Sequence, residues 1–222
     1  MDMPLMLAVI RTEPWDVARR LADFAITREQ LLEVIRACAS GAGNVTENDP
    51  PGTRGWETYR FGVRLLREQL RPDGWEPDNT DGLATITNAQ LEMRIAVANT
   101  DDATGVPDPV RFPQNRNKRG PTADRAVEAN ERLLPGIDWP IAAKPRGGVV
   151  SISDLVTWHL CIYVNGDDIR AELSLLDKIE GGWFTGWRER IIILKPGDWK
   201  AVDLPSEDDE SGPELDVDVR PR

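Results

Sequence analysis

The sequence predicts an α+β fold, with helices in the N-terminal third, a mainly antiparallel β-sheet after them, and a disordered acidic tail. Apolar residues recur at helical spacing in the first third, alternate or run in short blocks across the middle of the chain, and give way to acids at the end. A period of about 3.6 residues buries one face of a helix, and a period of two buries one face of a strand. We expect one domain at residues 1–202, with a helical part at 12–71 and a sheet part at 83–195, and a tail at 203–222.

A predicted β-hairpin at residues 158–175 is the centre of this fold. Asn165-Gly166 separates an apolar, β-branched run from an alternating one, and this dipeptide is a strong hairpin signal because both residues tolerate positive φ. The first arm is apolar almost throughout, so we expect it to be the more central strand. The second arm alternates, which predicts one buried and one solvated face. Residues 188–194 predict a third strand.

Capping residues mark the predicted helices. Thr12 precedes Pro14, a residue that favours the first turn of a helix, and Thr27 precedes Gln30 at the spacing of a capping box. The turn-rich stretch at 74–82 predicts a connection without regular structure. Further helices are expected at about 56–70 and 123–134, and further strands at 5–10, 84–87 and 91–98.

Charge and cysteine content describe the expected cellular setting. The net charge is −11, and the two cysteines, Cys38 and Cys161, both have apolar neighbours. Eight acids and two arginines fall at residues 203–222, so this segment carries −6 of the total. Such a segment is typical of a disordered solubilising tail, with a docking element as the alternative. The sequence has neither a disulfide framework nor an apolar run of membrane-spanning length, and we expect a cytoplasmic protein.

A basic loop before a predicted helix is the sharpest functional feature. Residues 110–125 hold five basic residues against one acid, Asp124, in an acidic protein. Thr122 is the predicted N-cap of the helix, whose backbone N–H groups and positive dipole end favour an anion. The glycine spacing and Lys-Ser/Thr pair of a P-loop are absent. The candidate binding residues are Arg116, Lys118, Arg119 and Thr122, and a surface loop with incidental charge is the alternative.

Two further groups of residues could contact a partner, one basic and one aromatic. The basic group recurs along one side of the helix predicted at 56–70, where it forms either an anion-binding row or a solvated face paired with glutamates. The aromatic group lies among glycines, as in a partner-contact loop, and the alternative is a cover over the sheet. The groups are Arg60, Arg64 and Arg67, and Trp183, Phe184 and Trp187.

The sequence carries no complete catalytic or cofactor signature. The single histidine, His159, lies between apolar strand residues, which is typical of a packed residue, and a multi-histidine site needs more than one. Glu92-Met93-Arg94 has arginine where a Glu-x-Lys nuclease motif has lysine. We therefore predict no catalytic residues, no metal and no cofactor. Two acidic groups could nevertheless hold a metal, namely Asp167, Asp168 and Glu172, or Asp78, Asp81, Asp101 and Asp102.

Four short segments resemble parts of uncharacterised bacterial proteins found among mobile-element and phage-defence genes. They are GWEPDN at 74–79, AVA leading into DDATG at 96–105, KRGPTAD at 118–124 and WRERIIIL at 187–194. The resemblance is discontinuous over about residues 74–194, has no family name, and implies no catalytic residues. It implies a small accessory component that works beside larger enzymes.

We therefore predict a non-catalytic binding or accessory protein that contacts a protein partner or an anionic ligand through the basic loop. Two alternatives stay open. One is a helix-turn-helix regulator at residues 14–39, which would contact duplex DNA through Arg28, Gln30 and Arg36. The other is a metal-dependent hydrolase or nuclease built on the acidic groups.

Overall fold

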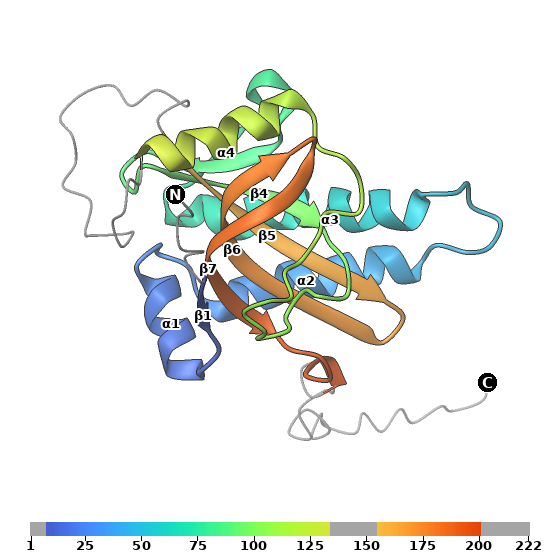
Figure 1. Ribbon diagram of the computed structural model, residues 1–222. Coiled ribbons are helices and arrows are strands. Elements are labelled where there is room, and N and C mark those ends of the chain that lie inside the picture. Colours follow the sequence, from blue (N-terminus) through green and yellow to red (C-terminus); the bar gives the residue numbers. More distant parts are fainter. Residues whose placement is uncertain (1–7, 134–154, 201–222) are drawn as a thin grey trace, which may run out of the picture.

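A computed structural model describes residues 8–133 and 155–200, in which a seven-stranded sheet is covered by helices on both faces (Figure 1). The strand order is β1-β7-β6-β5-β4-β3-β2. The helices are α1 (Pro14–Ala22), α2 (Arg28–Gly43), α3 (Thr53–Leu70) and α4 (Pro121–Leu133). The strands are β1 (Val9–Arg11), β2 (Glu76–Asp78), β3 (Thr85–Asn88), β4 (Met93–Asn99), β5 (Val156–Asn165), β6 (Asp168–Glu180) and β7 (Trp183–Leu194).

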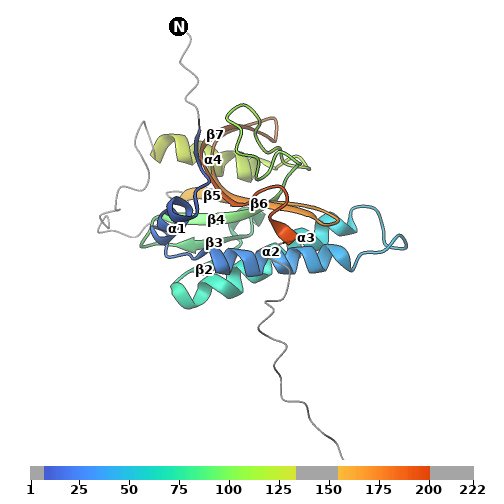
Figure 2. The ribbon, with the colours of Figure 1, turned by 90° about the horizontal axis from the view of Figure 1, so that it is seen from below.

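The predicted α+β class is confirmed, and the sheet is mainly antiparallel. β1 runs parallel to β7 and β4 runs parallel to β5, while the other four neighbouring pairs are antiparallel. A parallel pair needs a crossover connection, and the one between β4 and β5 includes α4. Figure 2 shows that α4 covers one face of the sheet while α2 and α3 cover the other. The last residue of β4, Asn99, donates to the Gly55 carbonyl, so the loop after β4 begins beside the start of α3.

The predicted hairpin is confirmed as β5 and β6. The strands pair as far as Asn165↔Asp168, so Gly166 and Asp167 form a two-residue turn. Asn165 therefore ends β5, and Gly166, with a φ of 58°, is the turn residue that needs the left-handed region. β5 occupies the middle of the strand order, as its apolar sequence predicted.

The prediction of a solvated face on β6 is wrong. The alternating residues Ile169, Ala171, Leu173 and Leu175 do pack in the core beneath α2 and α3. On the opposite face, however, Glu172 and Ser174 are fully buried. The loop after β4 and α4 cover this face (Figure 2). Glu172 accepts from the Gly105 N–H of this loop, and Ser174 donates to Glu172.

The capping box predicted for α2 is confirmed. The Thr27 hydroxyl accepts from the Gln30 backbone N–H at 3.2 Å, and the Gln30 side chain accepts from the Thr27 N–H at 2.8 Å. The cap predicted for α1 is wrong, because Glu13 holds the N-cap position and makes no side-chain capping bond. Pro14 follows it, and this residue suits the first turn because it has no N–H to satisfy.

Three further outcomes concern the ends of the chain and the sheet edge. The stretch at 74–82, predicted as a connection, contains the three-residue edge strand β2, whose central Pro77 lacks the N–H that an inner strand requires. Of the strand predicted at 5–10, residues 5–7 lie outside the described residues, and so does the tail predicted at 203–222. Among the described helices, none combines the length and apolarity that a membrane crossing requires.

Candidate anion-binding site

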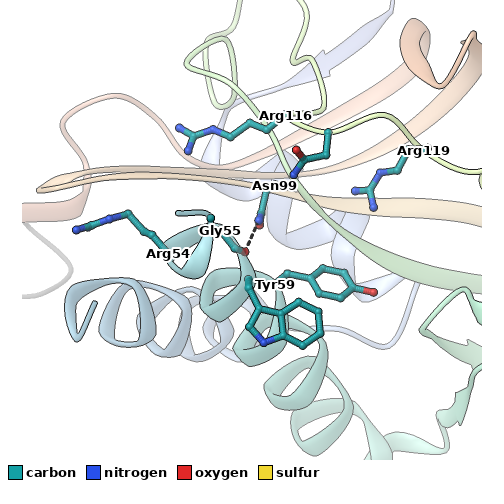
Figure 3. A pocket seen from close by; sticks show the side chains of 9 residues that line it. Arg54, Gly55, Tyr59, Asn99, Arg116 and Arg119 are labelled. Atoms are coloured by element: carbon teal, nitrogen blue, oxygen red, sulfur yellow. Dashed lines mark hydrogen bonds between the residues drawn. The ribbon is translucent and has the colours of Figure 1, made fainter. Parts of the chain in front are cut away.

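A cavity of about 540 Å³ lies where the start of α3 meets the loop that follows β4 (Figure 3). We name Arg54, Arg116 and Arg119 the cavity arginines: the first belongs to α3 and the other two to the loop. The lining contains no acidic side chain, so positive charge dominates the wall. The remaining lining residues are Gly52, Gly55, Trp56, Tyr59, Asn99 and Asn117.

The start of α3 contributes the positive end of a helix dipole. Gly52 is the N-cap, and no side chain caps the helix there. The first turn contains no acid, whereas α1, α2 and α4 each carry one in their first turn. The first N–H groups of a helix carry partial positive charge, which an acid or an anion near the terminus stabilises. In the first turn of α3 the charged side chain is instead that of Arg54, which lines the cavity.

Hydrogen bonds fix the position of the loop and of Arg116. The Asn99 side chain donates to the Gly55 carbonyl at 2.6 Å and so ties the end of β4 to the first turn of α3 (Figure 3). Arg116 donates from its backbone N–H to the Asn99 carbonyl at 3.1 Å and from Nε to the Thr100 carbonyl at 3.1 Å. Its guanidinium lies 5.1 Å from the ring centre of Tyr163, a cation–π distance. Arg116 is therefore positioned before any ligand arrives.

Arg119 is held more deeply than Arg116. Its backbone N–H donates to the Gly182 carbonyl at 2.9 Å, and its Nη2 donates to the Val97 carbonyl at 3.3 Å. The guanidinium lies 5.7 Å from the Phe184 ring, while Nε is buried and has no hydrogen-bond partner among the described residues. Burial lowers the pKa of Arg119, because the charged form loses hydration that the neighbouring groups do not fully replace.

The cavity arginines differ from the predicted basic row on α3. Arg60 pairs with Glu57 at 2.6 Å and Arg64 pairs with Glu68 at 2.8 Å, both on the helix surface. Arg67 donates to backbone carbonyls of the adjoining β2–β3 region, including Thr85 at 2.9 Å. Within residues 8–133 and 155–200, by contrast, none of the cavity arginines forms an ion pair. The cavity arginines therefore carry positive charge that no carboxylate of the described residues neutralises.

The predicted basic loop and the cavity overlap only in part. Two cavity arginines come from that loop, but they meet the start of α3 instead of the start of α4. The prediction that Thr122 is the N-cap of α4 is wrong, because the helix already begins at Pro121. Thr122 donates to the Asp81 carbonyl at 3.2 Å and accepts from Arg125 at 3.3 Å, and neither Thr122 nor Lys118 lines the cavity. The sequence does not point to Arg54, because residues 44–55 are rich in Asn, Thr, Pro and Gly, a composition typical of a loop. The one available signal was an arginine between two glycines just before the apolar stripe of α3.

The predicted aromatic group is mostly internal. Phe184 and Trp187 are buried and pack with Cys161 and Leu176 on the α4 side of the sheet. Trp183 is 37% exposed. Phe184 also contacts Arg119, so this aromatic cluster supports one wall of the cavity from behind.

The residues of the two alternative functions make bonds within the chain. Of the three proposed to contact DNA, Arg28 donates to the Ile193 carbonyl, Gln30 to Asp73, and Arg36 to Glu29 and Glu33. The part of the chain that the structure describes contains no group of three or more His, Cys, Asp or Glu residues placed to hold a metal ion. Comparison with protein-family models, curated proteins and solved structures gave no match.

His159 lies behind the cavity wall and is a packed residue. It is 2% exposed, its ring lies 5.3 Å from the Phe184 ring in an edge contact, and its Nδ1 is buried without a partner among the described residues. Burial lowers the pKa of His159 to about 3, with Arg119 and Arg94 adding to the shift. A neutral buried imidazole of this kind makes the stability of the fold depend on pH.

We expect acid to destabilise the protein through His159. Below about pH 6.5 the unfolded chain binds a proton that the folded chain does not accept until near pH 3, so this contribution is present above pH 6.5 and is lost as the pH falls. Between pH 8 and pH 5 the free energy of unfolding should fall by about 2 kcal/mol because of His159. Urea unfolding of the wild type and of His159→Leu at both pH values measures it. The free energy of unfolding should change less with pH in the variant than in the wild type. Equal changes would contradict the role given to His159.

Proposed function

We propose that this chain is a non-catalytic binding protein whose cavity at the start of α3 takes a multiply charged anion. The observation that carries the proposal is that Arg54, Arg116 and Arg119 line the same cavity and that no carboxylate belongs to its lining. A guanidinium presents its N–H donors in a planar fork that matches phosphate and carboxylate oxygens. With the positive end of α3 beside them, the three groups leave charge that an anion would neutralise.

Two features favour a bound anion over a merely solvated group of arginines. Arg119 is a partly buried cation, with a buried Nε and no ion pair among the described residues, an arrangement that costs stability unless an anion compensates it. Arg116 is already held by the Thr100 carbonyl and the Tyr163 ring, so little side-chain freedom is lost when a ligand binds. Both features make the cavity more favourable for an anion than an exposed arginine row would be.

We also propose the setting that the sequence resemblance implies. The chain would be an accessory protein of a bacterial multi-protein system, acting in the cytoplasm in phage defence beside larger enzymes. One of the four resembling segments, 118–124, supplies Arg119 to the cavity. A protein partner that carries a phosphate or an acidic group would use the same arginines.

Titration with inorganic tripolyphosphate tests the proposed function. At about 0.01 M ionic strength, where screening is weak, we expect saturable binding by isothermal titration calorimetry. Arg116→Gln combined with Arg119→Gln should lower the affinity at least about tenfold, because hydrogen bonds to charged groups contribute about 1.5–3 kcal/mol each. The matched control is Arg64→Gln, an exposed arginine of α3 outside the cavity lining, which should bind like the wild type. An absence of saturable binding by the wild type would refute the proposal.

A further inference from the structure

We infer that the anion is the phosphate group of a mononucleotide, whose base stacks on Trp56 at the mouth of the cavity. The inference rests on the proposed function, since it names the ligand class for the same arginines. The observation that carries it is that the cavity wall contains aromatic side chains as well as arginines. Two aromatic residues, Trp56 and Tyr59, belong to the same lining as the cavity arginines. Figure 3 shows Tyr59 together with these arginines.

Trp56 is exposed although it is among the most apolar side chains in the protein. It is 59% exposed, and its ring centre lies 6.0 Å from that of Tyr59 at an interplanar angle of 40°. The other strongly exposed tryptophan in the described residues, Trp15, has the Arg19 guanidinium 5.5 Å from its ring centre. Trp56 therefore presents an exposed apolar surface to the cavity. A flat aromatic ligand would cover that surface by stacking, which is sequence-tolerant and favourable for every nucleobase.

The size and polarity of the cavity fit a ligand larger than a lone phosphate. Its volume of about 540 Å³ lies in the range of small-molecule sites, roughly 300–1,000 Å³. Asn99 and Asn117 add side-chain amides to the lining, and the Asn99 Oδ1 is buried without a hydrogen-bond partner among the described residues. An amide can donate to and accept from the polar edge of a base. A lone phosphate would leave both the aromatic wall and the Asn99 Oδ1 without a partner.

The charge pattern favours a mononucleotide over a nucleic-acid strand. A protein that binds single strands needs a basic groove that follows the backbone over several nucleotides. Here the basic surface does not continue from the cavity along α3. The next arginines on that helix, Arg60 and Arg64, are neutralised by Glu57 and Glu68. The chain also carries a net charge of −11, which opposes the approach of a long polyanion. A ligand with one base and a short phosphate chain matches one aromatic wall and three arginines.

Comparing nucleotides with tripolyphosphate separates the affinity contributed by the base from that contributed by the phosphate chain. We would measure calorimetric affinities for tripolyphosphate and for ATP, GTP, CTP and UTP, all in excess EDTA. At least one nucleotide should bind about tenfold or more tightly than tripolyphosphate, the ratio that stacking of one base on an aromatic side chain provides. Trp56→Ala should remove this advantage and leave tripolyphosphate binding unchanged. The matched control, Trp15→Ala, removes an exposed tryptophan outside the cavity lining and should keep the advantage.

The outcomes distinguish the inference from the proposed function. If neither tripolyphosphate nor any nucleotide binds, the proposed function itself is wrong. If all bind equally and Trp56→Ala changes nothing, the anion site stands and the nucleotide inference falls. A single-stranded octanucleotide that binds more tightly than every mononucleotide would also overturn it, in favour of a strand. Because Trp56 is exposed, the variant should fold, and an unchanged thermal midpoint confirms that the comparison is valid.

Discussion

Replacing Arg190 by methionine is expected to lower the free energy of unfolding by about 3–5 kcal/mol, the usual cost of leaving one member of a buried ion pair alone. Arg190 on β7 and Glu172 on β6 are both fully buried, and their side chains meet in two hydrogen bonds of 2.9 and 2.7 Å. Glu172 also accepts from the Gly105 N–H at 2.9 Å and from the Ser174 hydroxyl at 2.7 Å. The methionine variant would leave this carboxylate buried without its counter-charge.

Arg190 also holds the loop that forms the cavity. Its guanidinium donates to carbonyls of the segment after β4, at distances of 3.1 to 3.4 Å. These acceptors are Ala103, Val106, Asp108 and Arg111. Further along the same loop, Arg116 and Arg119 line the cavity. We therefore expect the folded fraction of the variant to bind tripolyphosphate more weakly than the wild type, although Arg190 itself is outside the lining.

A double variant that removes both members of the ion pair tests whether the loop depends on the pair. Buried ion pairs can often be replaced by apolar residues at little cost. Here Arg190→Met with Glu172→Leu would still leave the Gly105 N–H and the loop carbonyls unbonded, so recovery of stability is not expected. Arg188→Gln is the control on the same strand: its partner Asp177 is 43% exposed, and surface pairs contribute at most about 1 kcal/mol. Chemical denaturation of all four proteins measures the set, and full recovery in the double variant would show that the loop does not depend on the pair.

Local sequence signals account for the elements that were predicted well. The hairpin of β5 and β6 follows from one dipeptide and its flanking apolar runs, and the start of α2 follows from Thr27 and Gln30. In each case the deciding interactions join residues that are close in sequence. The helix at Thr53–Leu70 was predicted to begin three residues late, at about residue 56, because its N-cap, Gly52, has no side chain that could form a capping bond.

Long-range contacts account for what the sequence did not reveal. The alternation of apolar and polar residues along β6 predicts that the polar residues face solvent. In the structure α4 and the loop after β4 cover them. The cavity joins Arg54 to Arg116 and Arg119, and only the meeting of α3 with that loop makes them neighbours. Charge counting found the latter two, since they belong to a basic cluster. It gave no means of telling them from Arg60 and Arg64, which differ only in having glutamate partners on their own helix.

Gly105→Ala is expected to lower the free energy of unfolding by about 3 kcal/mol or more, because three effects coincide at this position. Gly105 has a φ of 73°, a conformation that costs a residue with a Cβ about 1–2 kcal/mol. The new Cβ would lie 2.3 Å from the Leu194 carbonyl oxygen, a backbone atom that can move only by shifting the end of β7, and such overpacking costs about 1–3 kcal/mol. Any shift of Gly105 would also lengthen its bond to Glu172.

Gly43→Ala is the matched substitution for this test. Gly43 ends α2 with a helical backbone, and a Cβ there would meet nothing within 4 Å, so alanine should leave stability unchanged or raise it by up to about 1 kcal/mol. Urea unfolding of both variants therefore separates the strain at Gly105 from the general effect of adding a methyl group to a glycine. If Gly105→Ala were as stable as the wild type, the left-handed turn and its contact with β7 would be wrong. The anchoring of the loop that carries Arg116 and Arg119 to the cavity would then need another explanation.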